Sequence, residues 1–351
     1  MNTKFSAIAL SLICLMGCSS KNDSRSLDVE AFDKAISNPN TILIDLRSAA
    51  DYAASHIANA VNIDANQAAC EERLIALLPT DKPVALYAQG EGQCDSIARF
   101  LVEKGFEPLI LSPGFDGWGQ ANKEVTQEEV DLFKTVTGTP LKIYAVKHGS
   151  VKMQVGDKWV YVDPVTTAAP PATDFSAMPK ADLILVTHEH PDHYDSTAIS
   201  QLTKEGTILI TNPATHDRFA TTSNVLKNGD TKVLFNSWSI KAVPAYNTSA
   251  DKQQFHPQGR DNGYIVSIDN LHIYFAGDLE VIPELKDVSN IDIAFLPCNL
   301  PYTMNPEQLA EAANIIKPKV LFPYHYGETD LDQVAKLLDG SGIDVRIRRY
   351  K

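Results

Sequence analysis

The stretch LVTHEHPDHYD, residues 185–195, places three histidines and three carboxylates directly after the apolar run ADLILV. A loop that follows a buried strand can carry side chains into a crevice, and His188 and His190 can project toward one point. Asp192 and His193 can then project toward a neighbouring point. Neutral imidazoles and carboxylates are zinc ligands, and they also suit iron or manganese. The stretch therefore predicts a metal site rather than a solvated polar loop.

Two distant segments offer further ligands of the same kinds. IYFAGD (residues 273–278) ends an apolar run with Asp278, and VLFPYHYG (residues 320–327) carries His325 after another. A carboxylate or imidazole just past a buried strand is costly unless something pairs with it. Each alone would more often be a capping or core residue. Together with the loop, and in this order along the chain, they indicate a metal site built from several strand ends.

The pattern H-x-H-x-D-H after a strand, G-D after a later strand and a final histidine resembles the metallo-β-lactamase superfamily over residues 140–351. The resemblance implies an αββα sandwich that holds two divalent metal ions, with zinc expected and manganese or iron as alternatives. It assigns His188 and His190 to one ion, Asp192, His193 and His325 to the other, and Asp278 to a bridging position.

Several stretches resemble the branch of ascorbate-phosphate-lactonase-like hydrolases, among them VKHGSVKMQVGDKWVYVDP (residues 146–164) and LPYTMNPEQ (residues 300–308). The resemblance makes Asp163 an aspartate that orients a ligand histidine. A turn aspartate before Pro164 is the alternative. His148 either faces the site or belongs to a strand, and Tyr302 is a candidate on the substrate side.

The chain departs from the family at one ligand position. The family usually has another histidine after the strand that precedes the bridging aspartate, and VPAYNTS (residues 243–249) has Asn247 there. Asparagine is a poor zinc ligand, although its oxygen can bind a metal. His256, nine residues further on, either fills the gap or is a histidine of a surface loop. Without it, a mononuclear centre becomes an alternative.

This chemistry predicts an enzyme. A metal-bound water becomes a hydroxide nucleophile near neutral pH, and Asp192 or Asp278 can hold or carry the proton. The expected reaction is hydrolysis of an ester, lactone, amide or phosphodiester in a small-molecule substrate. Two alternatives remain open: a persulfide dioxygenase with one iron, and a non-catalytic binding protein in which the metal is structural.

The first third of the chain has a different pattern. Strand-like runs such as TILIDLR and PVALYAQ alternate with amphipathic helices, which predicts a parallel α/β sheet. Residues 27–122 resemble a rhodanese domain, and the residues that match its pattern are Asp45, Arg47, Tyr52, His56 and Trp118. Rhodaneses carry a sulfur-transferring cysteine where this chain has Ala88. Because Cys94 stands six residues later, in a different geometry, we expect a docking, binding or stabilising role. Residues 123–139 are predicted to form a connecting helix, with a capping box at Thr126 and Glu129.

The N-terminus resembles a bacterial lipoprotein leader. Lys4 precedes a short apolar segment that ends in LMGC, which predicts a leader over residues 1–17 and lipid attachment to Cys18. Residues 18–26 are a polar tether. An exported, membrane-anchored protein is expected, in the outer membrane if the host has two membranes. An ordinary secretory signal is the alternative. The net charge of −13 argues against nucleic-acid partners.

Overall fold

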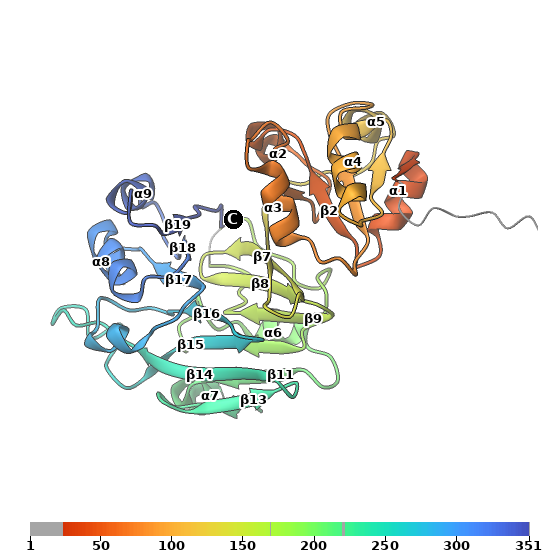
Figure 1. Ribbon diagram of the computed structural model, residues 1–351. Helices are drawn as coiled ribbons and strands as arrows, with labels where there is room; N and C mark the ends of the chain where they lie inside the picture. Colours follow the sequence, from red (N-terminus) through yellow and green to blue (C-terminus); the bar gives the residue numbers. More distant parts are fainter. Residues whose placement is uncertain (1–23, 169, 220–221, 351) are drawn as a thin grey trace, which may run out of the picture.

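The computed structural model describes residues 24–168, 170–219 and 222–350. The predicted leader and Cys18 lie outside these residues. Two domains follow each other along the chain, an N-terminal α/β domain and a larger sandwich of two sheets (Figure 1). Across the described ranges, no helix combines the length and the apolar character that crossing a membrane requires.

The N-terminal domain is a parallel sheet in the order β1-β5-β4-β2-β3, with helices against it. Its strands are β1 (Arg25–Leu27), β2 (Ile42–Asp45), β3 (Val61–Asn62), β4 (Val84–Tyr87) and β5 (Leu109–Leu111). Its helices are α1 (Val29–Ile36), α2 (Ala49–Ala54), α3 (Cys70–Leu77), α4 (Asp95–Glu103) and α5 (Gly114–Gln120). The continuous apolar runs of β2 and β4 are buried on both faces, as a central parallel strand requires.

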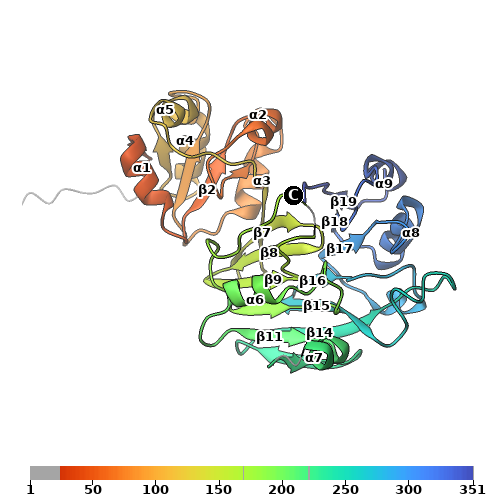
Figure 2. The same ribbon diagram turned by 180° about the vertical axis from the view of Figure 1, so that it is seen from behind.

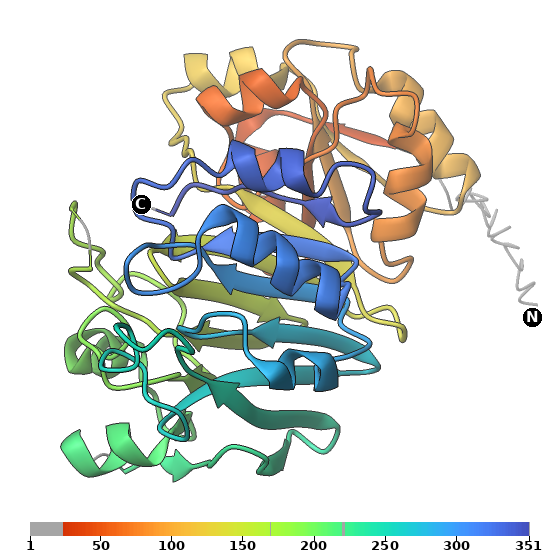
Figure 3. The ribbon, with the colours of Figure 1, turned by 90° about the vertical axis from the view of Figure 1, so that its left-hand side faces the viewer.

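The second domain packs two seven-stranded sheets face to face, a layering that Figures 2 and 3 show from behind and from the side. The first sheet contains β6 (Val130–Lys134), β7 (Pro140–Lys147), β8 (Ser150–Val155), β9 (Lys158–Val162), β10 (Leu183–Leu185), β11 (Ile208–Thr211) and β12 (Asn224–Val225). The second contains β13 (Thr231–Leu234), β14 (Trp238–Ala245), β15 (Asp261–Ile268), β16 (Leu271–Phe275), β17 (Ile293–Pro297), β18 (Val320–Tyr324) and β19 (Asp344–Val345). Alternate residues such as Ile143, Met153 and Phe295 fill the space between the sheets.

Helices cover the outer faces of the sandwich. The helical elements are α6 (Ser196–Leu202), α7 (Pro213–Phe219), η1 (Pro283–Asp287), α8 (Pro306–Ile316) and α9 (Asp332–Leu337). Ala198 and Leu202 of α6 pack on the outer side of the first sheet, and α8 packs on the second (Figure 3). Helix α8 starts at a full capping box, with Asn305 as N-cap and Gln308 returning the hydrogen bond. The predicted α/β fold, rhodanese-like sheet followed by αββα sandwich, is confirmed.

The predicted connecting helix over residues 123–139 is wrong. This segment contains strand β6, which pairs antiparallel with β7 at the edge of the first sheet. Thr126 caps only a short turn, through its Oγ1 and the Glu128 backbone N–H at 3.0 Å. Val130 and Leu132, two residues apart, pack into the core of the N-terminal domain. The strand period lets β6 serve both domains, and that tertiary contact outweighs the local helical pattern.

The N-terminal domain covers part of the outer face of the first sheet. Tyr144 of β7 packs in the same cluster as Leu74 and Val84, and its hydroxyl donates to Asn59 Oδ1 at 3.1 Å. His56 Nε2 also lies 2.9 Å from the Glu128 carbonyl oxygen. The two domains therefore share a core, and the N-terminal domain takes the place of a helix layer over β7 and β8.

Candidate metal centre

The polar residues of the site gather at one edge of the sandwich because the strands that carry them are parallel. Strands β9 and β10 run parallel in the first sheet, and β16, β17 and β18 run parallel in the second. Asp163 follows β9, His188 follows β10, Asp278 follows β16 and His325 follows β18. Carboxyl ends of parallel strands meet at the same edge, where a crevice can form between the two sheets.

One group of ligands consists of His188, His190 and His256, here called the three-histidine group, whose ring nitrogens lie within 4.8 Å of one another. His188 Nε2 lies 3.2 Å from His190 Nδ1. His256 is buried and its Nε2 lies 3.3 Å from Asp278 Oδ2. His256 therefore faces the loop that carries His188 and His190, beside Asp278.

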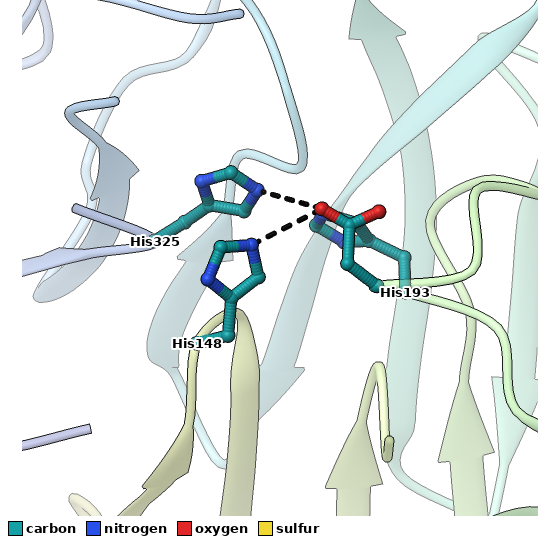
Figure 4. A group of neighbouring side chains, drawn as sticks. His148, His193 and His325 are labelled. Atoms are coloured by element: carbon teal, nitrogen blue, oxygen red, sulfur yellow. Dashed lines mark hydrogen bonds and ion pairs between the residues drawn. The ribbon is translucent and has the colours of Figure 1, made fainter. Parts of the chain in front are cut away.

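A second group consists of His148, Asp192, His193 and His325, here called the mixed group. Figure 4 shows His148 and His325 both directed at a carboxylate oxygen, with His193 on the far side of that carboxylate. His148 Nε2 lies 3.1 Å and His325 Nε2 3.5 Å from Asp192 Oδ2. The His148 ring therefore lies against Asp192, beside the other residues of the mixed group.

Asp278 lies between the two groups. Its Oδ2 is 3.3 Å from His256 Nε2 and 3.4 Å from His325 Nε2. Its Oδ1 is 3.4 Å from His193 Nε2. One buried carboxylate therefore contacts a histidine of each group, which is the geometry of a bridging ligand.

Unpartnered buried atoms show that a divalent ion fits these residues. His193 Nε2, His325 Nε2 and Asp278 Oδ1 are buried and have no hydrogen-bond partner within residues 24–168, 170–219 and 222–350. Leaving such atoms unpaired is costly unless an ion takes the place of the partner. Two ligands that bind one zinc ion tetrahedrally at about 2.0–2.1 Å lie roughly 3.3 Å apart. The separations of 3.3–3.4 Å between Asp278 and its three histidines match this arrangement.

The charges of the site favour a cation. Burial would lower the pKa of His193, but the carboxylates of Asp278, Asp163 and Asp192 raise it to about 10. Burial would raise the pKa of Asp192, but the neighbouring histidines hold it below its usual range. Burial and the imidazoles around it lower the pKa of His188, which keeps that ring neutral. The field that attracts a proton to His193 also attracts a divalent cation to the same nitrogen.

Contacts behind the ligands fix their orientation. Asp163 is buried, and its Oδ2 lies 2.7 Å from His193 Nδ1, which leaves Nε2 to face the centre. Thr187 holds Asp163 in turn, through its Oγ1 at 2.6 Å and its backbone N–H at 2.7 Å. Asp163 therefore contacts the His193 ring directly and holds its orientation. Gly149 leaves space for the His193 ring, because a Cβ at this position would lie 3.1 Å from His193 Cε1.

Three orienting residues were not found from the sequence. They are Thr187, Asp261 and Asn299. Asp261 Oδ2 lies 3.2 Å from His256 Nδ1, and Asn299 Nδ2 lies 3.4 Å from His325 Nδ1. Thr187 precedes His188 directly and could have been suspected. Nothing local marks Asp261 or Asn299, because their roles depend on the approach of separate loops.

Asn247 and Tyr302 brace the loop that carries His256. Asn247 is buried; its Nδ2 donates to the Lys252 and Tyr302 carbonyl oxygens, and its backbone N–H donates to the His256 carbonyl oxygen at 2.9 Å. Glu280 anchors the same loop through Ser249 and Lys252. The Tyr302 side chain is 45 % exposed and lies edge-on to Phe255. Asn247 therefore braces the loop of His256 through its Nδ2 and backbone N–H, while its Oδ1 is buried without a hydrogen-bond partner among the described residues.

The N-terminal domain contains no reactive thiol at the rhodanese position. Ala88 is buried at the end of β4, and burial, with Asp95 and Asp45, raises the pKa of the Cys94 thiol to about 12. A thiol with that pKa is a poor nucleophile. The residues of the rhodanese pattern are structural: Arg47 pairs with Asp45 in the interior, and the Trp118 indole donates to the Glu124 carbonyl oxygen.

Comparison with known proteins agrees with this geometry. Residues 142–325 match the family described as beta-lactamase superfamily domain, and residues 28–121 match rhodanese-like domain. The chain therefore belongs to the metallo-β-lactamase superfamily, with a rhodanese-like domain before the sandwich.

The relatives narrow the class to metal-dependent hydrolases. A UPF0173 metal-dependent hydrolase of Thermococcus onnurineus is 31 % identical over 194 residues, 53 % of this chain and 84 % of the relative. One of Thermus thermophilus is 32 % identical over 184 residues, 51 % of this chain and 80 % of the relative. The crystal structure of a candidate metal-dependent hydrolase from Parabacteroides distasonis is 46 % identical, with a TM-score of 0.61 over 64 % of this chain and 100 % of that chain. The predicted enzyme class, a metal-dependent hydrolase of this superfamily, is confirmed.

Proposed function

We propose that this protein is a dinuclear hydrolase that binds two divalent ions, with zinc as the expected metal. The three-histidine group would hold one ion, Asp192, His193 and His325 the other, and Asp278 would bridge them. The observation that carries the proposal is the position of Asp278, whose carboxylate lies within 3.4 Å of His256, His193 and His325. Imidazole nitrogen and carboxylate oxygen ligands suit zinc. Manganese and iron are the alternatives, and metal analysis of the purified protein distinguishes the three.

The two aspartates have different tasks in this proposal. A bound divalent ion lowers the pKa of a water molecule toward neutrality and polarises the substrate oxygen. The Asp278 side chain is only 3 % exposed and can therefore only hold ions, whereas the Asp192 side chain is 37 % exposed. Asp192 is accordingly the carboxylate that a substrate or leaving group can reach, and His148 orients its Oδ2.

The substrate class we propose is a small ester, lactone, amide or phosphodiester, with lactones and esters tested first. Leu300 and Tyr302 are exposed large hydrophobic side chains on the loop that braces His256. An apolar surface beside a polar metal centre suits a carbonyl substrate with an apolar body. The likeness of residues 146–164 and 300–308 to the ascorbate-phosphate-lactonase-like branch supports a lactone.

Chelation tests the proposed reaction. We expect the purified protein to hydrolyse at least one member of a panel of aryl esters, lactones, anilides and bis(p-nitrophenyl) phosphate. Dialysis against a chelator should abolish this activity and Zn²⁺ or Mn²⁺ should restore it, because the nucleophile and the polarised carbonyl both depend on the ion. Activity that survives complete metal removal, or metal retention without turnover of any panel member, would contradict the proposal.

We further propose that the protein is exported and anchored through a lipid on Cys18. The support is the leader-like sequence ending in LMGC and the polar tether after it. In a bacterial host, the wild type should partition into the membrane fraction and require detergent for release. Cys18→Ser should lose the acyl mass and leave the membrane fraction. Equal membrane association of both proteins would rule out the anchor.

A further inference from the structure

A cavity lies on the outer face of the first sheet, where β7, β8 and β9 face the N-terminal domain. It has a volume of about 400 Å³ and lies between the two domains. Leu43 and Asn59 of the N-terminal domain line one side, and Lys142, Gln154 and Trp159 of the sandwich line the other. The cavity is called here the Lys142 pocket, and its volume is that of a small-molecule site.

Lys142 lies in this pocket because of the alternation along β7. Leu141 and Ile143 point into the core between the sheets, so Lys142 points outward. It pairs with Leu132 on one neighbouring strand and with Gln154 on the other, and Gln154 in turn pairs with Trp159. A cation, an amide and an indole thus stand in one row across the three strands β7, β8 and β9.

The Lys142 ammonium group lacks a partner in the part of the chain that the structure describes. Its residue exposure is 5 %, yet no hydrogen bond or ion pair joins its Nζ to any residue of the described ranges. The Trp159 indole N–H likewise has no hydrogen-bond partner among those residues. A buried ammonium group without a counter-charge is strongly unfavourable. Burial lowers the pKa of Lys142 to about 8, which expresses this cost.

Among the charged residues that line the pocket, only the positive charge of Lys142 is not compensated by a neighbour. Its charged lining residues are Lys142, Lys152 and Glu128. Lys152 Nζ lies 3.1 Å from Glu128 Oε1 and 4.0 Å from the centre of the Tyr144 ring, so its charge is already compensated. A monoanion would neutralise what remains, whereas a phosphate dianion would bring more charge than the pocket balances.

We propose that the Lys142 pocket binds a small organic monocarboxylate whose carboxylate pairs with Lys142 and whose apolar body lies between Leu43, Trp159 and Met178. The wall supports this class, since Leu43, Trp159, Met178 and Pro179 are apolar or aromatic and line the same cavity. Because both domains contribute to the pocket, the ligand would also strengthen their docking. This site is independent of the proposed hydrolysis.

Matched probes test the charge requirement. Benzoate, benzamide and phenyl phosphate share an aromatic body and differ in charge, and their binding to the full chain in non-ionic detergent is measured by calorimetry. Benzoate should bind at least about tenfold more tightly than benzamide, the ratio expected for one charge-assisted hydrogen bond. Lys142→Met, which keeps an unbranched side chain but removes the terminal ammonium group, should remove that preference. Lys241→Met, at an exposed strand position of the other sheet, should leave it unchanged.

Chemical labelling of the wild type gives a second measurement that needs no variant. Acetylation by limiting acetic anhydride, followed at each lysine by mass spectrometry, should be slowed at Lys142 by saturating benzoate and unaffected at Lys241. Equal binding of benzoate and benzamide, a benzoate affinity that Lys142→Met leaves unchanged, or no protection of Lys142 would each overturn the proposal. Tighter binding of phenyl phosphate than of benzoate would overturn the monocarboxylate class.

Discussion

Replacing Asp278 with asparagine is expected to lower kcat/KM by about a thousandfold or more, the equivalent of roughly 4 kcal/mol of transition-state stabilisation. The carboxylate lies 3.3–3.4 Å from histidines of both ligand groups and is almost completely buried. An amide keeps the shape but removes the charge that balances two divalent ions. Metal content should therefore fall in both groups, which mass spectrometry of the purified protein measures together with hydrolysis.

Asp163→Asn is the matched control. Asp163 is buried and contacts His193 Nδ1, but it does not face the centre. Loss of an orienting carboxylate usually costs about 10–100-fold in metal affinity or activity. Asp278→Asn should thus be clearly more damaging than Asp163→Asn at saturating metal. If Asp278→Asn retained two ions and an activity within tenfold of wild type, Asp278 would not be the bridge.

Asp131→Asn is expected to destabilise the sandwich by about 3 kcal/mol, because it leaves two arginines without their buried partner. Asp131 lies on β6, at the edge of the first sheet, and binds Arg346 and Arg348 at 2.7–2.8 Å. Both arginines come directly after β19, which is the edge strand of the second sheet. The loss should appear as a lower midpoint of thermal unfolding, by roughly 6–12 °C for a domain of this size.

The same pairing predicts how stability depends on acid. Burial would raise the pKa of Asp131, but Arg348 and Arg346 lower it below its usual value. A carboxyl with a lowered folded-state pKa contributes its stability above its unfolded pKa, about 3.9, and loses it as the pH falls below that value. Wild type should lose this contribution below about pH 4, while Asp131→Asn should show a shallower acid dependence in the same range.

Asp344→Asn controls for the arginine contacts on the surface. Asp344 also pairs with Arg346, but its side chain is 52 % exposed. Exposed pairs contribute about 0–1 kcal/mol, so this change should barely alter unfolding. If Asp131→Asn also changed the unfolding free energy by less than about 1 kcal/mol, the buried network between the sheet edges would not stabilise the fold.

Much of the centre could be predicted because its residues follow strands that the sequence marks clearly. Asp278 and His325 come directly after apolar runs, and parallel strands bring such ends to one edge. His256 could be suggested only as an alternative, because its position depends on contacts that Asn247 and Glu280 make with a long loop. Those contacts have no periodicity that a sequence pattern would reveal.

The errors and omissions arose where one segment serves two domains. Strand β6 carries a helix-like local pattern, and its strand conformation follows from pairing with β7 and from burial of Val130 and Leu132 against the N-terminal domain. Lys142 is an outward-facing residue of β7, and nothing in the sequence around it indicates a pocket. Only the docked N-terminal domain encloses it, so its missing partner becomes visible in the structure alone.

The fold gives the rhodanese-like domain a role that needs no sulfur chemistry. It covers the outer face of β7 and β8, because a sheet in a sandwich of this kind requires a covering layer on that face. One hydrophobic cluster runs from the N-terminal domain to residues of β6 and β7. Ala88 and the buried Cys94 remove the thiolate that sulfur transfer requires. Stabilisation of the sandwich and enclosure of the Lys142 pocket are sufficient reasons for its presence.

The most direct test of the dinuclear centre is the metal-to-protein ratio of wild type and His256→Ala, purified side by side. We predict two divalent ions per chain in the wild type and about one in the variant, because His256 belongs to the three-histidine group and not to the mixed group. The folded state of both proteins is checked by circular dichroism. A single ion in the wild type that the variant retains in full would contradict the account.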